Sequence, residues 1–199
     1  MIVIGDVHGE FNMLMRLLDK LPQTDNLCFV GDLIDRGPDS KKVVDFVKDN
    51  NYYCVMGNHE DMVINDLHTW SINGAKETLK SFFENTEVDL DEFLKSDYIP
   101  WFRDLPLTIE HRMINGKIFI ISHSYAYYGH NTPDYDILWG RDFPEVDDQG
   151  FINIFGHTPI EEAMKLHNKH WLIDTGATFD NKLSAIDLTT EKIYSVEGK

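Results

Sequence analysis

Carboxylate, imidazole and amide side chains recur directly after short apolar runs in this 199-residue sequence. Each apolar run predicts a buried strand, and the Gly- or Ser-flanked segment behind it would lie at that strand's C-terminal end. This end of a parallel sheet is where ligand sites form in α/β proteins. Mixed oxygen and nitrogen ligands without a thiolate suit Mn²⁺, Fe or Zn²⁺ better than Ca²⁺. The candidate ligands are Asp6, His8, Asp32, Asn58, His123 and His157.

The segment from Val30 to Pro38 is the centre of this pattern, because it carries Asp32, Asp35 and Arg36 between two turn-forming glycines. Two divalent metals about 3.5–4 Å apart would bind and activate a bridging water. Such a pair needs a carboxylate that reaches both ions, and we expect Asp32 to be that carboxylate. Gly31 would let the backbone approach a ligand closely.

Each candidate also has an ordinary structural explanation when it is considered alone. Asp6 could cap a helix that begins near Glu10. His123, between two serines, could be a hydrogen-bonded core histidine, and His157 could be a turn residue. These separate explanations fail together, because they must account for five strand ends that all finish in a potential ligand. The remaining histidines lack this setting and are expected to be surface or core residues: His68, His111, His130, His167 and His170.

The elements that must position these residues follow from apolar periodicity and turn signals. Strands separated by helices in the first 61 residues predict a mostly parallel arrangement there, and the second half reads as β-rich. Asp6 and His8 should point to the same side of an extended segment. Met62 to Ile72 suits one helix, Asn73-Gly74 breaks it from the next, and Glu84–Glu92 suits a solvated loop or a helix start. Asn115-Gly116 predicts the turn of an antiparallel hairpin, and residues 183–188 and 193–196 predict a closing hairpin. Strands are expected at 1–4, 27–30, 52–56, 105–113, 117–122, 151–155, 171–173, 183–188 and 193–196, and helices at 11–21, 41–48, 62–72 and around 79–83.

Composition limits the class of protein. Apolar residues make up 42% of the chain, as in an ordinary globular domain, and no linker or repeat divides it, so residues 1–199 are expected to form one domain. Eighteen basic against 34 acidic residues give a formal charge of −16, which argues against a nucleic-acid partner. Cys28 and Cys54 lie in apolar runs and should be buried thiols. With no apolar stretch of 18 residues and no leader-like start, we expect no membrane partner and a cytoplasmic location.

Three of these segments together resemble the signature of the PPP-type metallophosphoesterases: Gly5-Asp6-Val7-His8-Gly9, Gly31-Asp32-Leu33-Ile34-Asp35-Arg36-Gly37 and Gly57-Asn58-His59-Glu60. The resemblance continues through Ser122-His123, Gly156-His157-Thr158-Pro159 and Asp174-Thr175-Gly176-Ala177, so it spans nearly the whole chain. Its short length and the segment Trp139-Gly140-Arg141 make the sequence most similar to the bacteriophage lambda-type serine/threonine protein phosphatases and their bacterial relatives. Ser-His-Ser at 122–124 departs from the His-Ala-Gly of eukaryotic members.

The resemblance implies a calcineurin-like α/β (α+β) fold, with two mixed β-sheets packed as a sandwich and flanked by helices. It implies two divalent metal ions, with Mn²⁺ first and Fe or Zn²⁺ as alternatives. Asp6 and His8 would bind one ion and share Asp32 with a second, which Asn58, His123 and His157 complete. His59 would be the general acid, oriented by Asp35. Arg36 and Arg141 would hold the phosphoryl oxygens.

The expected reaction is hydrolysis of phosphoserine and phosphothreonine in a protein or peptide substrate, with phosphotyrosine and small phosphoesters also accepted. A dinucleoside polyphosphate hydrolase is the alternative enzyme. Such relatives are usually longer, so a length of 199 residues favours the protein phosphatase. An inactive phosphoprotein-binding module is the alternative from another class, but it predicts a lost ligand or acid, and every expected position is filled. The Tyr125–Tyr135 loop is either a substrate wall or an ordinary surface loop.

Overall fold

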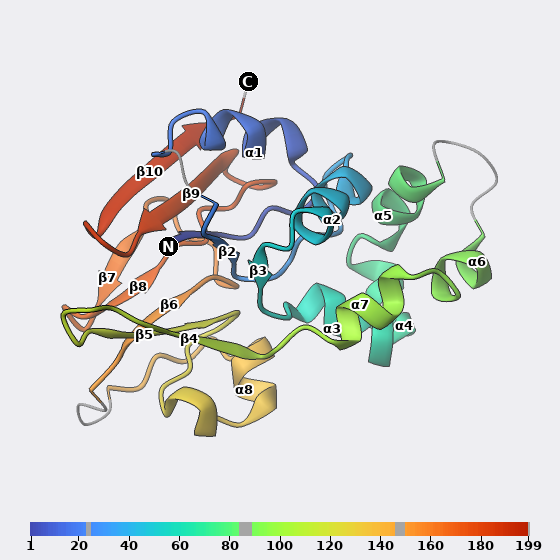
Figure 1. Ribbon diagram of the computed structural model, residues 1–199. Coiled ribbons are helices and arrows are strands. Elements are labelled where there is room, and N and C mark those ends of the chain that lie inside the picture. Colours follow the sequence, from blue (N-terminus) through green and yellow to red (C-terminus); the bar gives the residue numbers. More distant parts are fainter. Residues whose placement is uncertain (23–24, 84–88, 146–149, 199) are drawn as a thin grey trace.

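The strands of this computed structural model are described within residues 1–22, 25–83, 89–145 and 150–198. They are β1 (Ile2–Ile4), β2 (Leu27–Phe29), β3 (Tyr53–Cys54), β4 (Thr108–Arg112), β5 (Ile118–Ser122), β6 (Ile152–Phe155), β7 (Met164–Leu166), β8 (His170–Leu172), β9 (Lys182–Asp187) and β10 (Lys192–Glu197). Together they form two five-stranded sheets (Figure 1). The first sheet has the order β10-β9-β1-β2-β3, and the second has the order β4-β5-β6-β8-β7.

Both sheets mix parallel and antiparallel pairs. In the first sheet β1 and β3 run parallel to β2, while β9 is antiparallel to β1 and β10. In the second sheet β5, β6 and β8 are parallel neighbours, and β4 and β7 close the two edges in antiparallel pairs. The predicted pair of mixed sheets is therefore confirmed. The C-terminal ends of β1, β2 and β3 meet at one edge of the first sheet, where parallel strands deliver their loops.

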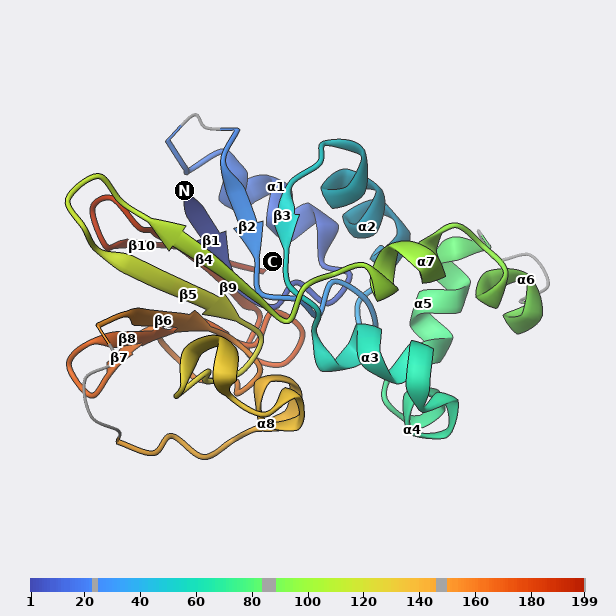
Figure 2. The same ribbon diagram turned by 60° about the horizontal axis from the view of Figure 1, so that its bottom comes forward.

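The two sheets pack face to face through one apolar layer. Val3 and Cys28 from the first sheet lie against Phe119, Ile121 and Ile154 from the second, and all five side chains are buried. Side chains alternate across a strand, so the neighbours of Val3 point to the opposite face. Figure 2 shows the sheets as separate layers. The first sheet is thus buried on both faces, which explains why its strands are apolar runs without alternation.

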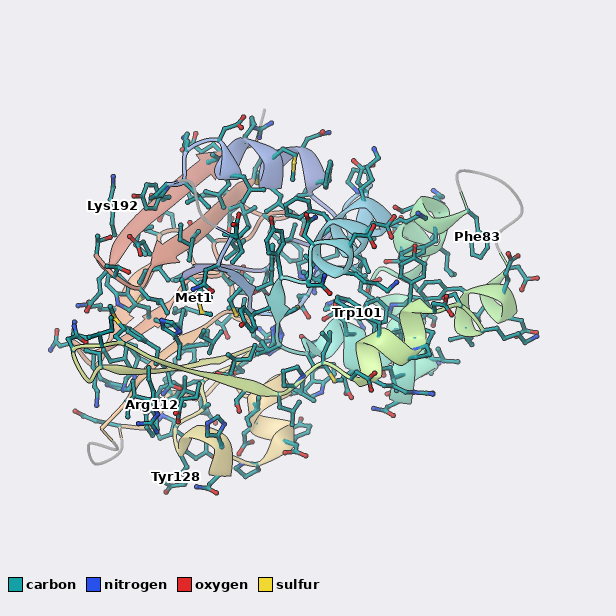
Figure 3. All side chains as sticks on the ribbon, in the orientation of Figure 1. Met1, Phe83, Trp101, Arg112, Tyr128 and Lys192 are labelled. Carbon is teal, nitrogen blue, oxygen red and sulfur yellow. The ribbon has the colours of Figure 1, made fainter. Side chains whose placement is uncertain are left out.

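Helices cover the outer faces of both sheets and extend beyond the edge of the first (Figure 2). They are α1 (Phe11–Leu18), α2 (Ser40–Asp49), α3 (Asn58–Asn65), α4 (Leu67–Ile72), α5 (Ala75–Phe82), α6 (Leu90–Leu94), α7 (Tyr98–Arg103) and α8 (Asp134–Trp139), with a short 3₁₀ turn η1 (Gly129–Asn131). Leu14 and Leu17 of α1 join Ile2 and Ile4 of β1 in one core cluster. Helices α3 to α7 form a lobe beside the sheets, which we call the helical lobe, and Trp101 lies within it (Figures 1 and 3).

The prediction of one helix over Met62 to Ile72 is wrong. Helix α3 ends at Asn65 and α4 begins at Leu67, because Asp66 caps the second helix. The Asp66 carboxylate accepts the N–H of Thr69 at 3.0 Å, the interaction that favours Asp at such positions. The predicted break at Asn73-Gly74 is confirmed, since α5 begins after Gly74. Of the acidic stretch 84–92, residues 84–88 lie outside the described residues, and α6 begins at Leu90.

Other local predictions are confirmed. Asn115-Gly116 closes the hairpin between β4 and β5, with Gly116 at a φ of +85° that glycine adopts without strain. Residues 183–188 and 193–196 fall in the hairpin of β9 and β10. Cys28 and Cys54 are buried free thiols. No helix within the described residues has the length and apolar character needed to cross a membrane. Treatment of residues 1–199 as one domain stays a prediction.

Candidate active site

The loops that follow β1, β2 and β3 are locked together by backbone hydrogen bonds. The N–H of His8 donates to the carbonyl of Asp32 at 2.8 Å, and the N–H of Gly37 donates to the carbonyl of His8 at 3.0 Å. The backbone is held in the left-handed region at several site residues, a conformation that costs free energy outside glycine and clusters at functional sites. These residues are His8, Asp32, Asp35, Arg36 and His157.

The geometry corrects one expectation about Asp6 and His8. The segment is not extended at His8, where φ is +46°, so simple alternation does not explain why the two side chains converge. They converge because the turn brings both of them to Asp32. Asp6 does not cap a helix; the residue before α1 is Glu10, and no side chain caps that end. Gly31 does allow a close approach, but the backbone it meets is that of Gly57.

Asp32 lies at the centre of the site and divides its two carboxylate oxygens between two groups of side chains. Oδ2 is 3.4 Å from Nε2 of His8 and 3.9 Å from Nε2 of His59. Oδ1 is 3.5 Å from Nε2 of His123. Ligand atoms of His8, Asp32 and His59 lie within 4.8 Å of one another, as do those of Asp6, Asp32 and His123. Asp32 is therefore the shared member of two adjoining groups.

The group on the Oδ1 side contains more acceptors than donors. Nε2 of His123 lies 2.8 Å from Oδ1 of Asn58 and 3.1 Å from Nδ1 of His157, and these last two atoms are 3.0 Å apart. Nδ1 of His123 donates its proton to the carbonyl of Val30 at 2.8 Å, which leaves a lone pair on Nε2. Three acceptor atoms thus converge with at most one proton among them. A divalent cation satisfies such a group, so these residues fit a metal ion.

The group on the Oδ2 side is arranged in the same way. Nδ1 of His8 donates to the carbonyl of Ile34 at 2.8 Å, so the Nε2 lone pair faces Asp32. Metal-binding histidines in proteins are typically oriented by such a bond from their second nitrogen. Asp6 accepts the N–H of His157 at 3.1 Å, which holds its carboxylate beside both groups. The six predicted ligands come together in one place.

His59 is held differently from the other histidines. Its Nδ1 donates to Oδ2 of Asp35 at 2.5 Å, and both side chains are buried. Its Nε2 faces the site and accepts from Nη2 of Arg36 at 2.8 Å. Nη1 of Arg36 contacts Nε2 of His8. The predicted pair of His59 and Asp35 is therefore present, and Arg36 spans the nitrogens of two histidines.

The charges of the site shift its pKa values in opposite directions. Burial alone would raise the pKa of Asp32, but His123, His59 and His8 hold it well below its ordinary value. Burial, with the nearby charges of Asp174 and Asp32, raises the pKa of Asp6 well above its ordinary value. Several carboxylates therefore share a buried site that contains too few positive charges for all of them, and a bound cation would supply the missing charge.

The pKa values of the site histidines also shift in two directions. Burial lowers the pKa of His8 and that of His123, and burial together with His123 lowers the pKa of His157 to about 3. These rings are therefore neutral, the form that binds metal. For His59, burial also favours the neutral ring, but Asp32 and Asp35 outweigh it and raise the pKa above its ordinary value. Only a charged imidazole can donate a proton from Nε2 while Nδ1–H remains bound to Asp35.

A pocket of about 200 Å³ opens onto this constellation. Arg36 and Arg141 both line it, as predicted for groups that hold phosphoryl oxygens. Phe179 lines it too, although its side chain is 63% exposed, and the Arg36 guanidinium carbon lies 4.9 Å from the centre of its ring. Nothing in the motif pattern pointed to Phe179. The pocket combines two cationic groups with one flat apolar wall.

Two further acidic residues at the site were quoted in the motifs but given no role. Glu60 is fully buried and accepts the N–H groups of Asp32, Leu33 and Gly57 at 2.9–3.0 Å, which fixes two of the loops to each other. Burial and the nearby Asp32 raise its pKa to about 7. Asp174 lies beside Asp6, and burial raises its pKa to about 7. The signal for Glu60 was its place three residues after Gly57, the spacing of a capping box.

The five histidines that were set aside contribute no ligand atom to the two groups around Asp32 in the described part of the chain. His68 and His130 are exposed, and His170 is a buried residue of β8 in the second sheet. The Tyr125–Tyr135 loop contributes no residue to the lining of the pocket at Asp32, as far as that lining is described. Tyr128 is half exposed at the lower edge of the molecule (Figure 3).

Two mixed sheets that carry this oxygen and nitrogen donor set at their strand ends define a metallophosphoesterase, the class of metal-dependent phosphoester hydrolases. The chain belongs to the calcineurin-like phosphoesterase family, whose sequence model matches residues 1–185.

Relatives in this family carry two kinds of name. The chain is 32% identical to serine/threonine-protein phosphatase 1 of Salmonella typhimurium, over 92% of this chain and 88% of the relative. It is 29% identical to the asymmetrical bis(5'-nucleosyl)-tetraphosphatase PrpE of Halalkalibacterium halodurans, over 99% of this chain and 93% of the relative. A solved structure described as a suspected diadenosine tetraphosphatase matches with a TM-score of 0.71 and 21% identity, over 100% of this chain and 93% of that one. Relatives with both kinds of name therefore match nearly the whole chain.

Proposed function

We propose that this protein hydrolyses phosphomonoesters with the help of two divalent metal ions, and that its substrates are phosphoserine and phosphothreonine residues of proteins or peptides. The observation that carries the proposal is the buried pair of His59 and Asp35 beside Asp32. A carboxylate that divides its oxygens between two donor groups, next to an imidazole with a raised pKa, supplies the three needs of the reaction: cation binding, an activated water and a proton for the leaving group.

The proposed ligands follow from the donor geometry. Asp6 and His8 would hold one ion and share Asp32 with the other. The second ion would take Asn58, His123 and His157, the three residues whose acceptor atoms converge with at most one proton among them. When bound, the ions would supply Lewis acidity and a water that is deprotonated near neutral pH. Mn²⁺ is our first choice because of the mixed oxygen and nitrogen donors, with Fe and Zn²⁺ as alternatives.

His59 is the proposed general acid. Attack of a water oxygen on phosphorus breaks the bond to the ester oxygen, and this oxygen leaves with the proton from Nε2 of His59. Asp35 holds the opposite nitrogen at 2.5 Å, so the ring can present only Nε2 to the pocket. The carboxylates of Asp32 and Asp35 raise the pKa of His59 against the effect of burial, which keeps its proton available. General acids of this kind contribute about 10²–10⁴-fold to rates.

Arg36 and Arg141 are the proposed phosphoryl-binding groups, since both line the pocket at Asp32. In this structure Arg36 donates to Nε2 of His59, the same nitrogen that carries the acidic proton in our mechanism. Two donors cannot share that hydrogen bond, so Arg36 must release His59 when the ring is protonated. The oxygens of a bound phosphoryl group are charged and match a planar guanidinium, so they are the better acceptor.

The pocket size favours a phosphorylated side chain as the substrate. A volume of about 200 Å³ accommodates a phosphoryl group and the first atoms of its ester. Pockets that enclose whole drug-sized ligands measure roughly 300–1,000 Å³. A phosphoserine on a protein surface would insert only its phosphate, and the rest of the protein would remain outside. The identity of 32% to a protein phosphatase supports the same choice.

Hydrolysis of dinucleoside polyphosphates is the second candidate. It is supported by the tetraphosphatase relative, which matches 99% of this chain, and by the solved structure with a TM-score of 0.71. The same metals, acid and arginines would serve this reaction, but the two nucleosides would have to bind outside the pocket at Asp32. A binding module without activity is less well supported, because each proposed ligand and the acid are present. A cytoplasmic location remains a prediction.

The first experiment restores metals to stripped protein. Hydrolysis of p-nitrophenyl phosphate is measured after Mn²⁺, Zn²⁺, Mg²⁺ or Ca²⁺ is added separately. We expect strong recovery with Mn²⁺ and little with Ca²⁺, because Ca²⁺ prefers a larger set of oxygen ligands. Folded protein that turns over with none of these metals would contradict the phosphomonoesterase.

The second experiment compares a phosphoserine peptide with diadenosine tetraphosphate under the best metal condition. A higher kcat/KM on the peptide supports the protein phosphatase, and a higher kcat/KM on the dinucleotide supports the second candidate. His68→Asn is a suitable control protein in both experiments, because His68 is exposed on α4 and belongs to neither donor group around Asp32 in the described part of the chain. It should behave as the wild type on either substrate.

A further inference from the structure

Asp35 receives its hydrogen bonds from two sides of the molecule. His59 contacts one carboxylate oxygen from the side of the site. From the opposite side, Nε1 of Trp70 donates to both oxygens of Asp35 at 3.0 Å, and Oγ1 of Thr78 donates to Oδ1 at 2.5 Å. Trp70 belongs to α4 and Thr78 to α5, so both donors come from the helical lobe. Nothing in the sequence motifs connects these two residues to the site.

The contact between the helical lobe and Asp35 is direct and fully buried. Asp35 and Thr78 are 0% exposed and Trp70 is 1% exposed. Thr78 also accepts the N–H of Asp35 at 2.8 Å, so one hydroxyl bonds both the backbone and the side chain of the same residue. Gly74, in the turn between α4 and α5, leaves no room for a side chain, because a Cβ there would lie 2.7 Å from that of Asp35.

The number of hydrogen-bond donors around a buried carboxylate determines how costly its burial is and how freely it can rotate. An ionised carboxylate out of water is costly unless its oxygens are hydrogen-bonded. Trp70 and Thr78 occupy the lone pairs that His59 does not use, so both carboxylate oxygens are hydrogen-bonded and the group is unable to rotate. The φ of Asp35 is +72°, a strained conformation that persists only where surrounding contacts hold it.

The Trp70 side chain is itself held in place by aromatic contacts on the side away from Asp35. Its ring stacks on Phe93 of α6 with centroids 5.7 Å apart and an interplanar angle of 17°, and Phe93 in turn contacts Phe82 edge-on at 4.8 Å. The indole N–H can therefore point only toward Asp35. Supports of this kind are what an accurate site requires, since a group displaced by about 1 Å costs about 10²-fold in rate.

We propose that Trp70 and Thr78 are positioning residues, through which the helical lobe holds Asp35 and thereby aims Nε2 of His59 at the leaving oxygen. This inference rests on the proposed role of His59 as general acid. It gives α4 and α5 a catalytic purpose: they set protonation of the leaving group, although no residue of either helix lines the pocket at Asp32 in the described part of the chain. Substrates with basic leaving groups need the proton most, so they depend on Trp70 and Thr78 most strongly.

The test compares two substrates in conservative variants. Trp70→Phe keeps the aromatic packing on Phe93 but removes the N–H, and Thr78→Val keeps the shape but removes the hydroxyl. We expect kcat on a phosphoserine peptide, whose leaving group is a basic alkoxide, to fall about 10-fold in each variant, a fraction of what a general acid contributes. On p-nitrophenyl phosphate, whose leaving group departs without a proton, kcat should fall less than 3-fold. KM should stay unchanged on both.

Two further variants separate positioning from packing. Thr78→Ser retains the hydroxyl and should restore the wild-type ratio of the two substrates. Trp101→Phe makes the same substitution elsewhere in the helical lobe, where it should not alter this ratio. Equal losses on both substrates in Trp70→Phe and Thr78→Val, or no loss on either, would overturn the proposal.

A measurement without turnover distinguishes this inference from the proposed function. The Nδ1 proton of His59, bound to Asp35 at 2.5 Å, should give a downfield, slowly exchanging signal in ¹H–¹⁵N spectra. We expect this signal to broaden or exchange faster in Trp70→Phe and Thr78→Val and to persist in Trp101→Phe. If the wild type is inactive but the signal changes in these two variants and not in Trp101→Phe, the hydrolase is refuted, whereas the support of Asp35 by Trp70 and Thr78 is confirmed. An active wild type whose variants keep the signal unchanged would refute the positioning role alone.

Discussion

The backbone N–H of His157 donates to the carboxylate of Asp6 at 3.1 Å, although 151 residues separate the two in the chain. Asp6 follows β1 in the first sheet, and His157 follows β6 in the second. This one bond therefore ties the strand ends of the two sheets together at the centre of the proposed metal site. The position of Gly156 makes the approach possible, because a Cβ there would overlap the Asp6 carboxylate and lie 2.8 Å from Val30.

The substitution Gly156→Ala should therefore separate Asp6 from His157. We expect metal affinity to fall about 10–100-fold, the usual effect of disturbing a residue that orients a ligand. Overpacking should also destabilise the fold by about 1–3 kcal/mol. Metal titration followed by calorimetry measures the first effect, and thermal unfolding measures the second.

Gly116→Ala is the matched control for this substitution. A side chain at Gly116 meets no atom within 4 Å, but φ there is +85°, so the variant should lose about 1 kcal/mol of stability without any change in metal affinity. Equal metal affinities in Gly156→Ala and the wild type would show that the contact between Asp6 and His157 does not matter for the site.

His59→Asn tests the general acid. Asn retains a polar group but cannot donate an acidic proton, so kcat on a phosphoserine peptide should fall about 10²–10⁴-fold. The proposed ligands are untouched, so metal content, measured by elemental analysis, should equal that of the wild type. His68→Asn, an exposed histidine on α4, should keep full activity. Full activity in His59→Asn would remove this residue from the acid role.

Phe179→Ala tests the exposed aromatic wall of the pocket. The ring lies 4.9 Å from the guanidinium carbon of Arg36, a cation–π contact worth about 0.5–1 kcal/mol at an exposed position. We expect KM for p-nitrophenyl phosphate and phosphotyrosine to rise about 2–5-fold, with a smaller change for phosphoserine, because a flat leaving group would stack on the ring. Tyr135→Ala, 71% exposed and outside the lining of this pocket, should change none of these values.

The ion pairs of Glu191 predict a pH dependence of stability. Lys117 and Lys165 of the second sheet donate to Glu191, in the turn between β9 and β10 of the first sheet, at 2.7 and 2.9 Å. These two bonds lower the pKa of Glu191 to about 2. A carboxylate whose pKa is lower in the folded state stabilises the fold above its unfolded pKa of about 4.3, and this stabilisation disappears as pH falls toward 2.

Glu191→Gln should consequently lower the Tm at pH 7 and have a much smaller effect near pH 2. The lysine side chains are 48% and 41% exposed, so solvent screening limits the effect to about 1 kcal/mol, or roughly 2–4 °C for a chain of this size. Glu162→Gln removes a carboxylate that is 72% exposed and should have a smaller effect. A Tm difference that persists unchanged at pH 2 would contradict this explanation.

Much of the local structure could be predicted because its signals are local. Apolar runs identified β1, β2, β5 and β6, and the Asn115-Gly116 turn identified a hairpin. The helix predicted over 62–72 failed at Asp66, where a capping side chain outweighed apolar periodicity. No separate element was predicted at β7, α7 or α8, and only a loop or a helix start was predicted near α6, because packing decides such short elements more than propensity does.

The sequence by itself determined which side chains could carry the chemistry, because each follows an apolar strand within a few residues and local rules govern that spacing. It therefore supplied the proposed donor residues, and the resemblance of its motifs to a known signature added the proposed acid and arginines. Tertiary structure alone decided which distant groups surround them: the support of Asp35 by Trp70 and Thr78, the bond between His157 and Asp6, and the place of Phe179 over Arg36. The physical reason is that such contacts depend on strand order and helix packing, which bring together segments whose separation in the chain leaves no local pattern.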